Sequence, residues 1–342
     1  MSPRITVAGA GSIGCYVGGT LARAGRMVTL LVRPRLAAAI EQNGLRISDV
    51  DGRDGVLSKN SITVTTDPAQ AFARSDIVLV TVKSGATAEM AALIAAHIPA
   101  HCTVVSLQNG VRNADVLRAA LGAGRTVAPA MVPFNVVHRE EEDKPPLFHR
   151  STSGAIAIAA GAANLRAALD VPGLAVHENP DIAGVLWSKL IVNLNNAPNA
   201  LAGVSIIDTI SDRGWRKLFA AQIEEALKVY RAAGIRPAKI AGMNPAIIPW
   251  LLRLPNFLFR RFTARMGSID PRARTSMLED LERRRTTEID YLHGEIAALA
   301  RKAGVKTPVI DEMIRRVKAA EAAGNGSPNL RASDIRLPAR SR

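Results

Sequence analysis

Apolar and polar positions along the first half of the chain predict strands that alternate with helices. A short apolar run at residues 4–8 is followed by helical spacing through Leu21 and Ala24, and a second strand-like run covers 27–32. Further runs of buried-strand type cover residues 76–83, 102–110 and 126–134. Strands that alternate with helices in this way indicate a parallel sheet with helices on both faces. Residues 45–67 instead alternate and contain Asp-Gly turns, which predicts small inserted antiparallel strands.

The second half of the chain is mostly helical. From residue 181 to 330 strand signals are few, and a long helix is predicted over 276–304, ended by Gly304. A chain of 342 residues exceeds the size that one core usually serves. We therefore expect an α/β protein: a Rossmann-type doubly wound domain at 1–180, an all-helical domain at 181–330 and a flexible tail at 331–342.

A glycine-rich stretch follows the first predicted strand and opens the first predicted helix. It reads Gly-Ala-Gly-Ser-Ile-Gly and starts at Gly9. In this motif Gly9 permits a tight turn, Gly11 lets the backbone approach a pyrophosphate, and Gly14 lets helix and strand pack closely. The phosphates would lie at the helix N-terminus, beside the amides of Ser12 and Ile13. This context predicts a dinucleotide-binding site.

The end of the second strand indicates which dinucleotide binds. An NAD site usually has an acidic residue there, which accepts hydrogen bonds from the ribose hydroxyls. Here the sequence is Leu-Val-Arg-Pro-Arg, with Arg33 at that place, Arg35 nearby and no carboxylate. An arginine favours a 2′-phosphate, so we predict NADPH/NADP+ as the cofactor. The alternative is an ordinary surface arginine.

Two polar residues end later strands, where open α/β sheets bind their ligands. Lys83 ends the run at 76–83, and Asn109 lies near the end of the run at 102–110. Both are therefore candidates for the cofactor site, although polar residues at strand ends often only cap loops.

A lysine and two asparagines share one face of a predicted helix. On an ideal helix Asn193 and Asn196 lie within about 40° of Lys189, among apolar residues. Either the lysine stem packs and its amine reaches water, or the face lines a pocket and the amine handles a proton. Pro198 is expected to end or kink this helix at Ala197.

The predicted long helix carries two charges within its apolar stripe, Arg285 and Glu288. They form either an i, i+3 ion pair at the edge of the stripe or a charged window that opens on a pocket. Both interpretations stay open at this stage.

Composition excludes several function classes. The net charge is +14, yet the basic residues lack interleaved aromatic residues and a nucleic-acid motif, so no nucleic-acid partner is expected. No leader peptide, no apolar run long enough to span a membrane and only two cysteines indicate a cytoplasmic protein. No metal site is expected, because His97 and His101 are separated by Pro99.

Residues 245–274 are apolar and then strongly basic. They could form a lid, a surface for a homodimer, a membrane-surface patch or a helical hairpin packed on its own domain.

The glycine motif with its arginine, followed in order by LVTVK, LQNG, WSKLIVN and RRRTTEIDYLHGEI, resembles the ketopantoate reductases, which are 2-dehydropantoate 2-reductases. The resemblance covers roughly residues 4–320. It implies a Rossmann domain, a helical domain, an active cleft between them and NADPH-dependent reduction of a 2-oxo acid in pantothenate biosynthesis.

The resemblance also implies roles for individual residues. Lys189 matches the catalytic lysine that donates a proton to the substrate carbonyl, and Asn193 matches an active-site asparagine. Glu288 matches the glutamate that binds the substrate hydroxyl, and Ser276 matches a serine near the substrate carboxylate. Matches to residues beside the cofactor are Lys83, Asn109 and Arg33, and Asn109 is also expected to bind the substrate.

Two departures from the family pattern concern the substrate. Ala197 and Ala273 stand where the family has asparagines, although Asn196 could partly replace the first. The alternatives are therefore the same hydride chemistry on a different 2-oxo acid or an imine, or a non-catalytic NADPH-binding regulator. The set of Lys189, Asn193 and Glu288 argues against the regulator, since a sensor needs no general acid.

Overall fold

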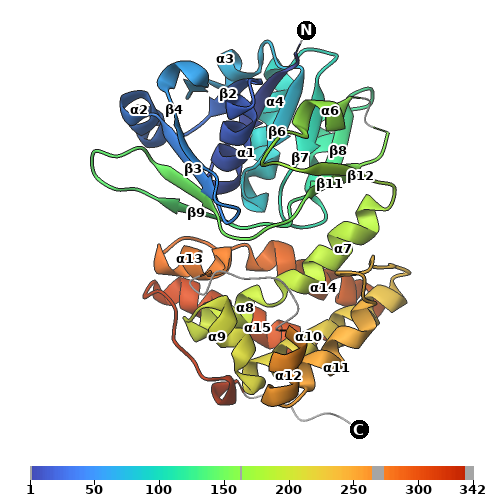
Figure 1. Ribbon diagram of the computed structural model, residues 1–342. Helices are drawn as coiled ribbons and strands as arrows, with labels where there is room; N and C mark the ends of the chain where they lie inside the picture. The colour runs from blue at the N-terminus through green and yellow to red at the C-terminus, as the bar shows by residue number, and fades with distance from the viewer. Residues whose placement is uncertain (1, 162–163, 264–272, 336–342) are drawn as a thin grey trace. The chain divides into compact units, whose positions relative to one another are not determined.

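The computed structural model describes residues 2–161, 164–263 and 273–335. The chain forms two compact units, Met1–Ile182 and Ala183–Arg342, and each is described by itself (Figure 1).

The first unit is built on a main sheet in which parallel strands predominate. In spatial order its strands are β5 (Thr63–Thr65), β2 (Met27–Leu31), β1 (Arg4–Ala8), β6 (Ile77–Val80), β7 (Thr103–Ser106), β8 (Thr126–Met131), β11 (Ile156–Ala159) and β12 (Val176–Asn179). In this spatial order the strands from β5 through β2, β1, β6 and β7 to β8 are parallel. β11 is antiparallel to β8, and β12 is parallel to β11. The predicted Rossmann-type sheet is confirmed. The strand order reverses between β1 and β6, the position where such sheets bind ligands.

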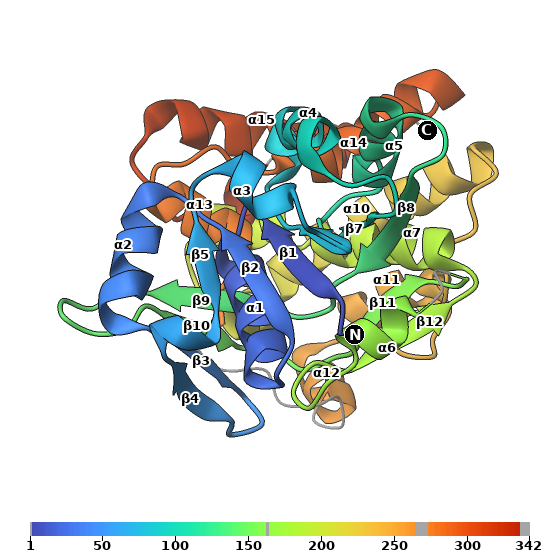
Figure 2. The same ribbon diagram turned by 90° about the horizontal axis from the view of Figure 1, so that it is seen from above.

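Helices cover the two faces of the main sheet (Figure 2), and a second sheet contacts α1. The helices of this unit are α1 (Ser12–Arg23), α2 (Pro34–Asn43), α3 (Pro68–Phe72), α4 (Thr87–His97), α5 (Asn113–Leu121) and α6 (Leu165–Leu169). Figure 2 shows α3, α4 and α5 on one side of the strands and α1 on the other. Alternate residues of a strand therefore enter different cores: Val7 packs in one cluster and Ala8 in the other.

The predicted insertion at 45–67 forms only part of a second sheet. β3 (Leu45–Asp49) and β4 (Asp54–Leu57) are antiparallel, as expected, but β5 pairs with β2 in the main sheet instead. The second sheet is completed by β10 (Leu147–Arg150) and β9 (Val136–Arg139), which the sequence pattern did not indicate.

A buried arginine ties this second sheet to helix α1. The Arg150 side chain forms ion pairs with Asp49, at 3.5 Å, and with Asp51. Its guanidinium carbon lies 5.8 Å from the centre of the Tyr16 ring, and Tyr16 belongs to α1. A buried charge needs such partners, since its desolvation would otherwise cost several kcal/mol (about 3–5).

Both cysteines are buried free thiols in the first unit. Burial raises the pKa of Cys15, on α1, and raises that of Cys102 to about 12.

The second unit is helical. Its helices are α7 (Ile182–Asn193), α8 (Asn196–Ala202), α9 (Ile206–Ser211), α10 (Arg213–Ala232), α11 (Ile248–Arg253), α12 (Asn256–Thr263), α13 (Ser276–Glu282), α14 (Ile289–Ala303) and α15 (Pro308–Ala323). Residues 331–335 of the expected tail include a short 3-10 turn at Ala332–Asp334 and a buried Ile335, and the rest of that tail lies outside the described residues.

The prediction that Pro198 ends the lysine helix is wrong. Helix α7 ends at Asn193, and Pro198 lies inside the first turn of α8. A proline is tolerated there because the first amides of a helix have no intrahelical acceptor.

The predicted long helix is also wrong. Helices α13 and α14 are separate, and Arg284 between them has a φ of +53°. The amide of Arg285 donates to the carbonyl of Asp280 at 2.8 Å, a bond typical of a helix that ends in a left-handed residue. Thr287 then accepts a hydrogen bond from the amide of Ile289 at 3.2 Å. Gly304 ends α14 in the left-handed conformation, as predicted.

Residues 245–263 of the apolar and basic segment form a short 3-10 turn and the two short helices α11 and α12, and 264–272 lie outside the described residues. Arg216, which is 1% exposed, binds the end of α11 by donating to the carbonyls of Leu252 and Leu254, each at 3.0 Å. Its guanidinium also lies 4.2 Å from the centre of the Phe259 ring. The described part of the segment is therefore packed on its own unit.

Candidate active site

The glycine turn has the geometry that a bound phosphate needs. Gly9 has a φ of +74°, and a side chain at Gly11 would meet no atom within 4 Å, so the backbone there is open. A Cβ at Gly14 would lie 2.8 Å from Val7 and 2.4 Å from Thr81, so only glycine fits between helix and strand. The N-terminus of α1 has no side-chain cap and no acidic residue in its first turn. Its amides, near Ser12 and Ile13, can therefore bind an anion.

Arg33 lies where the sequence argument expected it. It directly follows β2 as the residue before α2 and is exposed. Within the described parts of the chain no acidic side chain pairs with Arg33, whereas Arg35 pairs with Glu140. Arg33 can therefore accept a phosphate without breaking an ion pair.

A buried amide missed by the sequence argument holds the loops that carry Lys83 and Asn109. Gln108 donates to the carbonyl of Val82 at 3.0 Å and to the hydroxyl of Thr87 at 2.7 Å. These bonds join the loop after β7 to the loop after β6. Lys83 is exposed and Asn109 is partly exposed, so both side chains can reach a ligand at this edge of the sheet.

Ser84 and Asn113 fix the backbone of Asn109. The Ser84 hydroxyl donates to the Asn109 carbonyl at 3.0 Å, and the Asn113 amide donates to the same carbonyl at 2.5 Å. The signal that could have revealed this network is the run of polar residues directly after a buried strand.

Lys189 and Asn193 lie one turn apart on α7, as predicted. The lysine side chain keeps some exposure, but the protein around its ammonium group lowers its pKa to about 8 by desolvation. Asn193 is 6% exposed, and its amide nitrogen has no hydrogen-bond partner among the described residues. Its N–H groups are therefore available to a ligand.

The remaining candidates lie on three other elements of the second unit. Asn196 is the first residue of α8, so the ideal-helix angle that placed it beside Lys189 does not apply. Ser276 is the exposed first residue of α13, and Glu288 directly precedes α14 and is half-buried. Because Arg285 and Glu288 do not share a helix, the expected helical spacing between them does not apply either.

The two alanines that depart from the family pattern are core residues. Ala197 is 0% exposed and Ala273 is 2% exposed. The Ala273 carbonyl accepts the amide of Ile206 at 2.8 Å.

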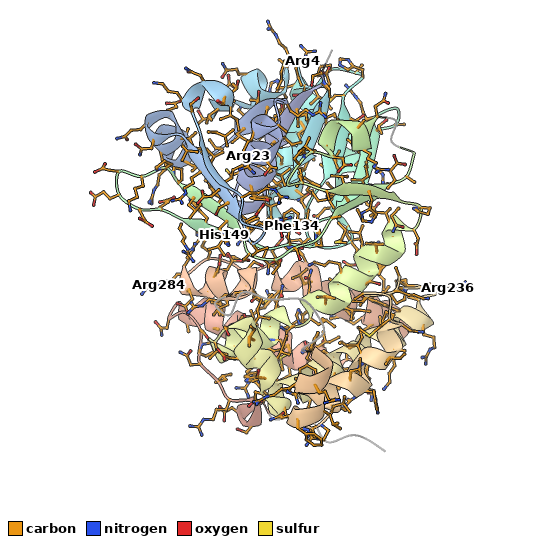
Figure 3. All side chains as sticks on the ribbon, viewed as in Figure 1. Arg4, Arg23, Phe134, His149, Arg236 and Arg284 are labelled. Atoms are coloured by element: carbon orange, nitrogen blue, oxygen red, sulfur yellow. The ribbon has the colours of Figure 1, made fainter. Side chains whose placement is uncertain are left out.

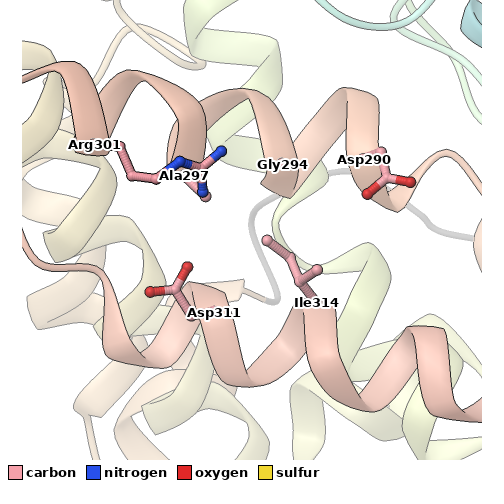
Figure 4. Close-up of a pocket in the computed structure, with 6 residues that line it drawn as sticks. All are labelled: Asp290, Gly294, Ala297, Arg301, Asp311 and Ile314. Atoms are coloured by element: carbon pink, nitrogen blue, oxygen red, sulfur yellow. The ribbon is translucent and has the colours of Figure 1, made fainter.

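A surface pocket of the second unit is lined by none of these candidate residues. It is formed by α14 and α15 and is lined by Asp290, Gly294, Ala297, Arg301, Asp311 and Ile314 (Figure 4). Asp290 already pairs with Lys318 at 2.6 Å.

Basic side chains lie on the surfaces of both units. Figure 3 labels Arg4 and Arg23 in the first unit and Arg236 and Arg284 in the second, and all four are exposed.

Neither a membrane span nor a metal centre is present in the described part of the chain. None of its helices combines the length and apolar character needed to cross a bilayer. The same residues contain no cluster of three or more His, Cys, Asp or Glu that could hold a metal ion.

The parallel sheet, the open glycine turn at the end of β1 and the separate helical unit define a dinucleotide-binding protein of the two-domain reductase type. Family models match both halves: "Ketopantoate reductase PanE/ApbA" matches residues 5–162, and its C-terminal counterpart matches residues 181–321. The chain belongs to the ketopantoate reductase family.

Individual proteins are similar over nearly the whole chain. The 2-dehydropantoate 2-reductase of Halobacterium salinarum is 27% identical over 330 residues, which cover 94% of this chain and 100% of that protein. A PanE/ApbA family ketopantoate reductase from Ralstonia eutropha JMP134 is 30% identical with a TM-score of 0.77, covering 94% of this chain and 99% of the other.

A D-mandelate dehydrogenase solved with NADH and anilino(oxo)acetate has a TM-score of 0.76 at 20% identity, with coverage of 94% and 99%. At that identity the likeness shows the fold alone.

Proposed function

We propose that the protein is an NADPH-dependent oxidoreductase that reduces a 2-oxo acid to the 2-hydroxy acid, with 2-dehydropantoate (ketopantoate) as substrate. The observation that carries the proposal is the pair of Lys189 and Asn193: an amine with a pKa of about 8 beside a buried amide donor without a protein partner. The similar reductases from H. salinarum and R. eutropha support the substrate class. The proposed setting is the cytoplasm and pantothenate biosynthesis.

The glycine turn, the N-terminus of α1 and Arg33 fit NADPH, because they offer open backbone, free amides and a cation without an acidic partner. When bound, NADPH supplies the hydride. Lys83 and Asn109 would hold the nicotinamide side of the cofactor. A preference for NADPH over NADH rests on Arg33 and on the absence of an acidic residue in the stretch from residue 30 to 35.

Lys189 would stabilise the charge that develops on the substrate oxygen and donate a proton to it. Asn193 would donate a second hydrogen bond to the same group. Ser276 and Glu288 would bind the carboxylate and the hydroxyl of the substrate, and Asn196 would assist. A preorganised set of donors lowers the barrier because it needs no reorganisation when charge develops.

The test of the proposed function is NADPH oxidation with ketopantoate and a panel of other 2-oxo acids, followed by absorbance. Preferred turnover of ketopantoate is the expected result. Preference for another 2-oxo acid or an imine would keep the chemistry and replace the substrate. Tight NADPH binding without any turnover would favour a non-catalytic regulator.

The activity is expected to fall in alkaline solution. Only the protonated amine of Lys189 can donate a proton, so kcat/KM should be level below pH 8 and fall about tenfold per pH unit above it. A lysine of ordinary pKa would postpone the fall by more than two pH units, to about 10.4. The measurement is kcat/KM between pH 6 and 10. A rate that stays level up to pH 10 would contradict the lowered pKa of Lys189.

We also propose that the chain forms a homodimer through the exposed apolar side chains of α11 and α12. Trp250 on α11 is 64% exposed and Phe257 on α12 is 71% exposed, and exposed apolar side chains of this size can be covered by a partner. The double variant Trp250→Ser/Phe257→Ser should sediment as a monomer, while Val56→Ser, at an exposed apolar position of the first unit, should not change the assembly. A wild-type chain that sediments as a monomer at all concentrations would exclude the dimer.

A further inference from the structure

A fully buried amide in the second unit joins the chain after the lysine helix to the start of α13. Asn199 is 0% exposed and lies on α8. Its side-chain oxygen accepts hydrogen bonds from the amide of Thr275 at 3.1 Å and from the hydroxyl of Thr275 at 2.9 Å. Its nitrogen donates to the carbonyl of Val204 at 2.8 Å and to the hydroxyl of Thr209 at 2.9 Å. All four hydrogen-bonding positions of the amide are therefore used.

The oxygen side of this amide acts on the first turn of α13. Thr275 is the N-cap of α13, and its hydroxyl accepts a hydrogen bond from the amide of Leu278 at 3.3 Å. The hydroxyl thus donates to Asn199 and accepts from the helix at the same time. Ser276 is the next residue. Its backbone position is therefore set by the two bonds between Thr275 and Asn199.

The side-chain nitrogen of Asn199 binds a different helix, α9. Thr209 belongs to α9, and its hydroxyl donates to the carbonyl of Ser205 at 2.9 Å. Removing this partner would cost one buried hydrogen bond of Asn199 without touching α13. The side-chain oxygen and nitrogen of Asn199 therefore have separate partners, and only Thr275, the partner of the oxygen, is next to Ser276.

We propose that Asn199 is a positioning residue that, through Thr275, fixes Ser276 relative to the helix of Lys189 and so sets the affinity for the substrate carboxylate. The inference rests on the proposed function. Asn199 itself touches no substrate: it links α8, which follows α7 after two residues, to α13, and neither Asn199 nor Thr275 has a role in the sequence prediction.

The test compares two isosteric variants, Thr275→Val and Thr209→Val. Each removes one hydroxyl group that is hydrogen-bonded to the side chain of Asn199. Thr275→Val is expected to raise the KM for the 2-oxo acid about tenfold, because Ser276 loses its fixed place. The kcat, the affinity for NADPH and the alkaline limb of the pH profile should stay near wild type. Thr275→Ser keeps the hydroxyl and should restore the KM. Thr209→Val should lower the melting temperature to a similar extent and leave the KM unchanged.

The outcomes separate the inference from the proposed function. Equal rises in KM for Thr209→Val and Thr275→Val would mean general loosening and overturn the inference, and so would an unchanged KM in Thr275→Val. An unchanged KM in Ser276→Ala, with an active wild type, would also overturn it and leave the reductase intact. A wild type that reduces no 2-oxo acid would overturn the proposed function and the inference with it.

Discussion

Replacing Lys189 by alanine is expected to lower kcat by about 10²- to 10⁴-fold, the usual contribution of a positioned general acid. The variant loses the Lys189 amine, whose pKa is lowered to about 8 by desolvation. Helix α7 has no other acidic or basic side chain that could donate a proton in its place. The dissociation constant for NADPH should stay unchanged, because the glycine turn and Arg33 belong to the other unit. Steady-state kinetics and a fluorescence titration with NADPH measure the two quantities.

The control for this variant is Val192→Ala on the same helix. Val192 is 40% exposed, so its truncation tests only whether α7 tolerates a smaller side chain. Near-normal turnover in Lys189→Ala would refute the role of the lysine. A similar loss in Val192→Ala would mean that the helix, and not the amine, is responsible.

Replacing Arg33 by aspartate is expected to raise the KM for NADPH about 10- to 100-fold. The variant removes a charge-assisted contact worth about 1.5–3 kcal/mol and adds a repulsion toward the 2′-phosphate. An aspartate at the end of β2 can instead accept hydrogen bonds from a free ribose hydroxyl, so the KM for NADH should stay level or fall. Steady-state kinetics with both cofactors give the ratio.

Arg35→Asp makes the same charge change two residues further along. Arg35 is 86% exposed at its side chain and pairs with Glu140, so its replacement should change the KM for NADPH little. Equal effects of the two replacements would indicate long-range electrostatics instead of a phosphate contact, and no effect of either would remove the basis for NADPH specificity.

The Rossmann half could be predicted because its signals are local. Gly9, Gly11 and Gly14 each meet a backbone requirement that appears in the structure as a positive φ, an open backbone and a close helix–strand contact. Strands β9 to β12 gave no comparable signal, since they are short and β10 pairs with β3, which lies far away in the sequence.

The helical half was predicted in kind but not in detail. Periodicity continues through the break between α13 and α14, because the left-handed turn is made by Arg284 and not by a glycine. Pro198 was expected to break a helix and lies in the first turn of one instead. The angles inferred between Lys189 and Asn196 assumed a single helix and therefore could not hold.

The amides that organise the candidate site were not recognisable from sequence. Gln108 and Asn199 look like ordinary polar residues of loops and helix ends, and their importance comes from partners up to 76 residues away. Lys189 and Asn193 were recognisable because both lie on one short helix, where spacing alone fixes their geometry.

The two buried thiols have a practical consequence for studying this reductase in solution. Cys15 and Cys102 are enclosed and poorly ionised near neutral pH, so alkylating reagents should find little thiolate to attack in the folded protein. A single cysteine introduced at an exposed position, such as Val56 on β4, would then take up a fluorophore selectively without removal of the native pair. The wild-type background is thus already suited to site-specific labelling.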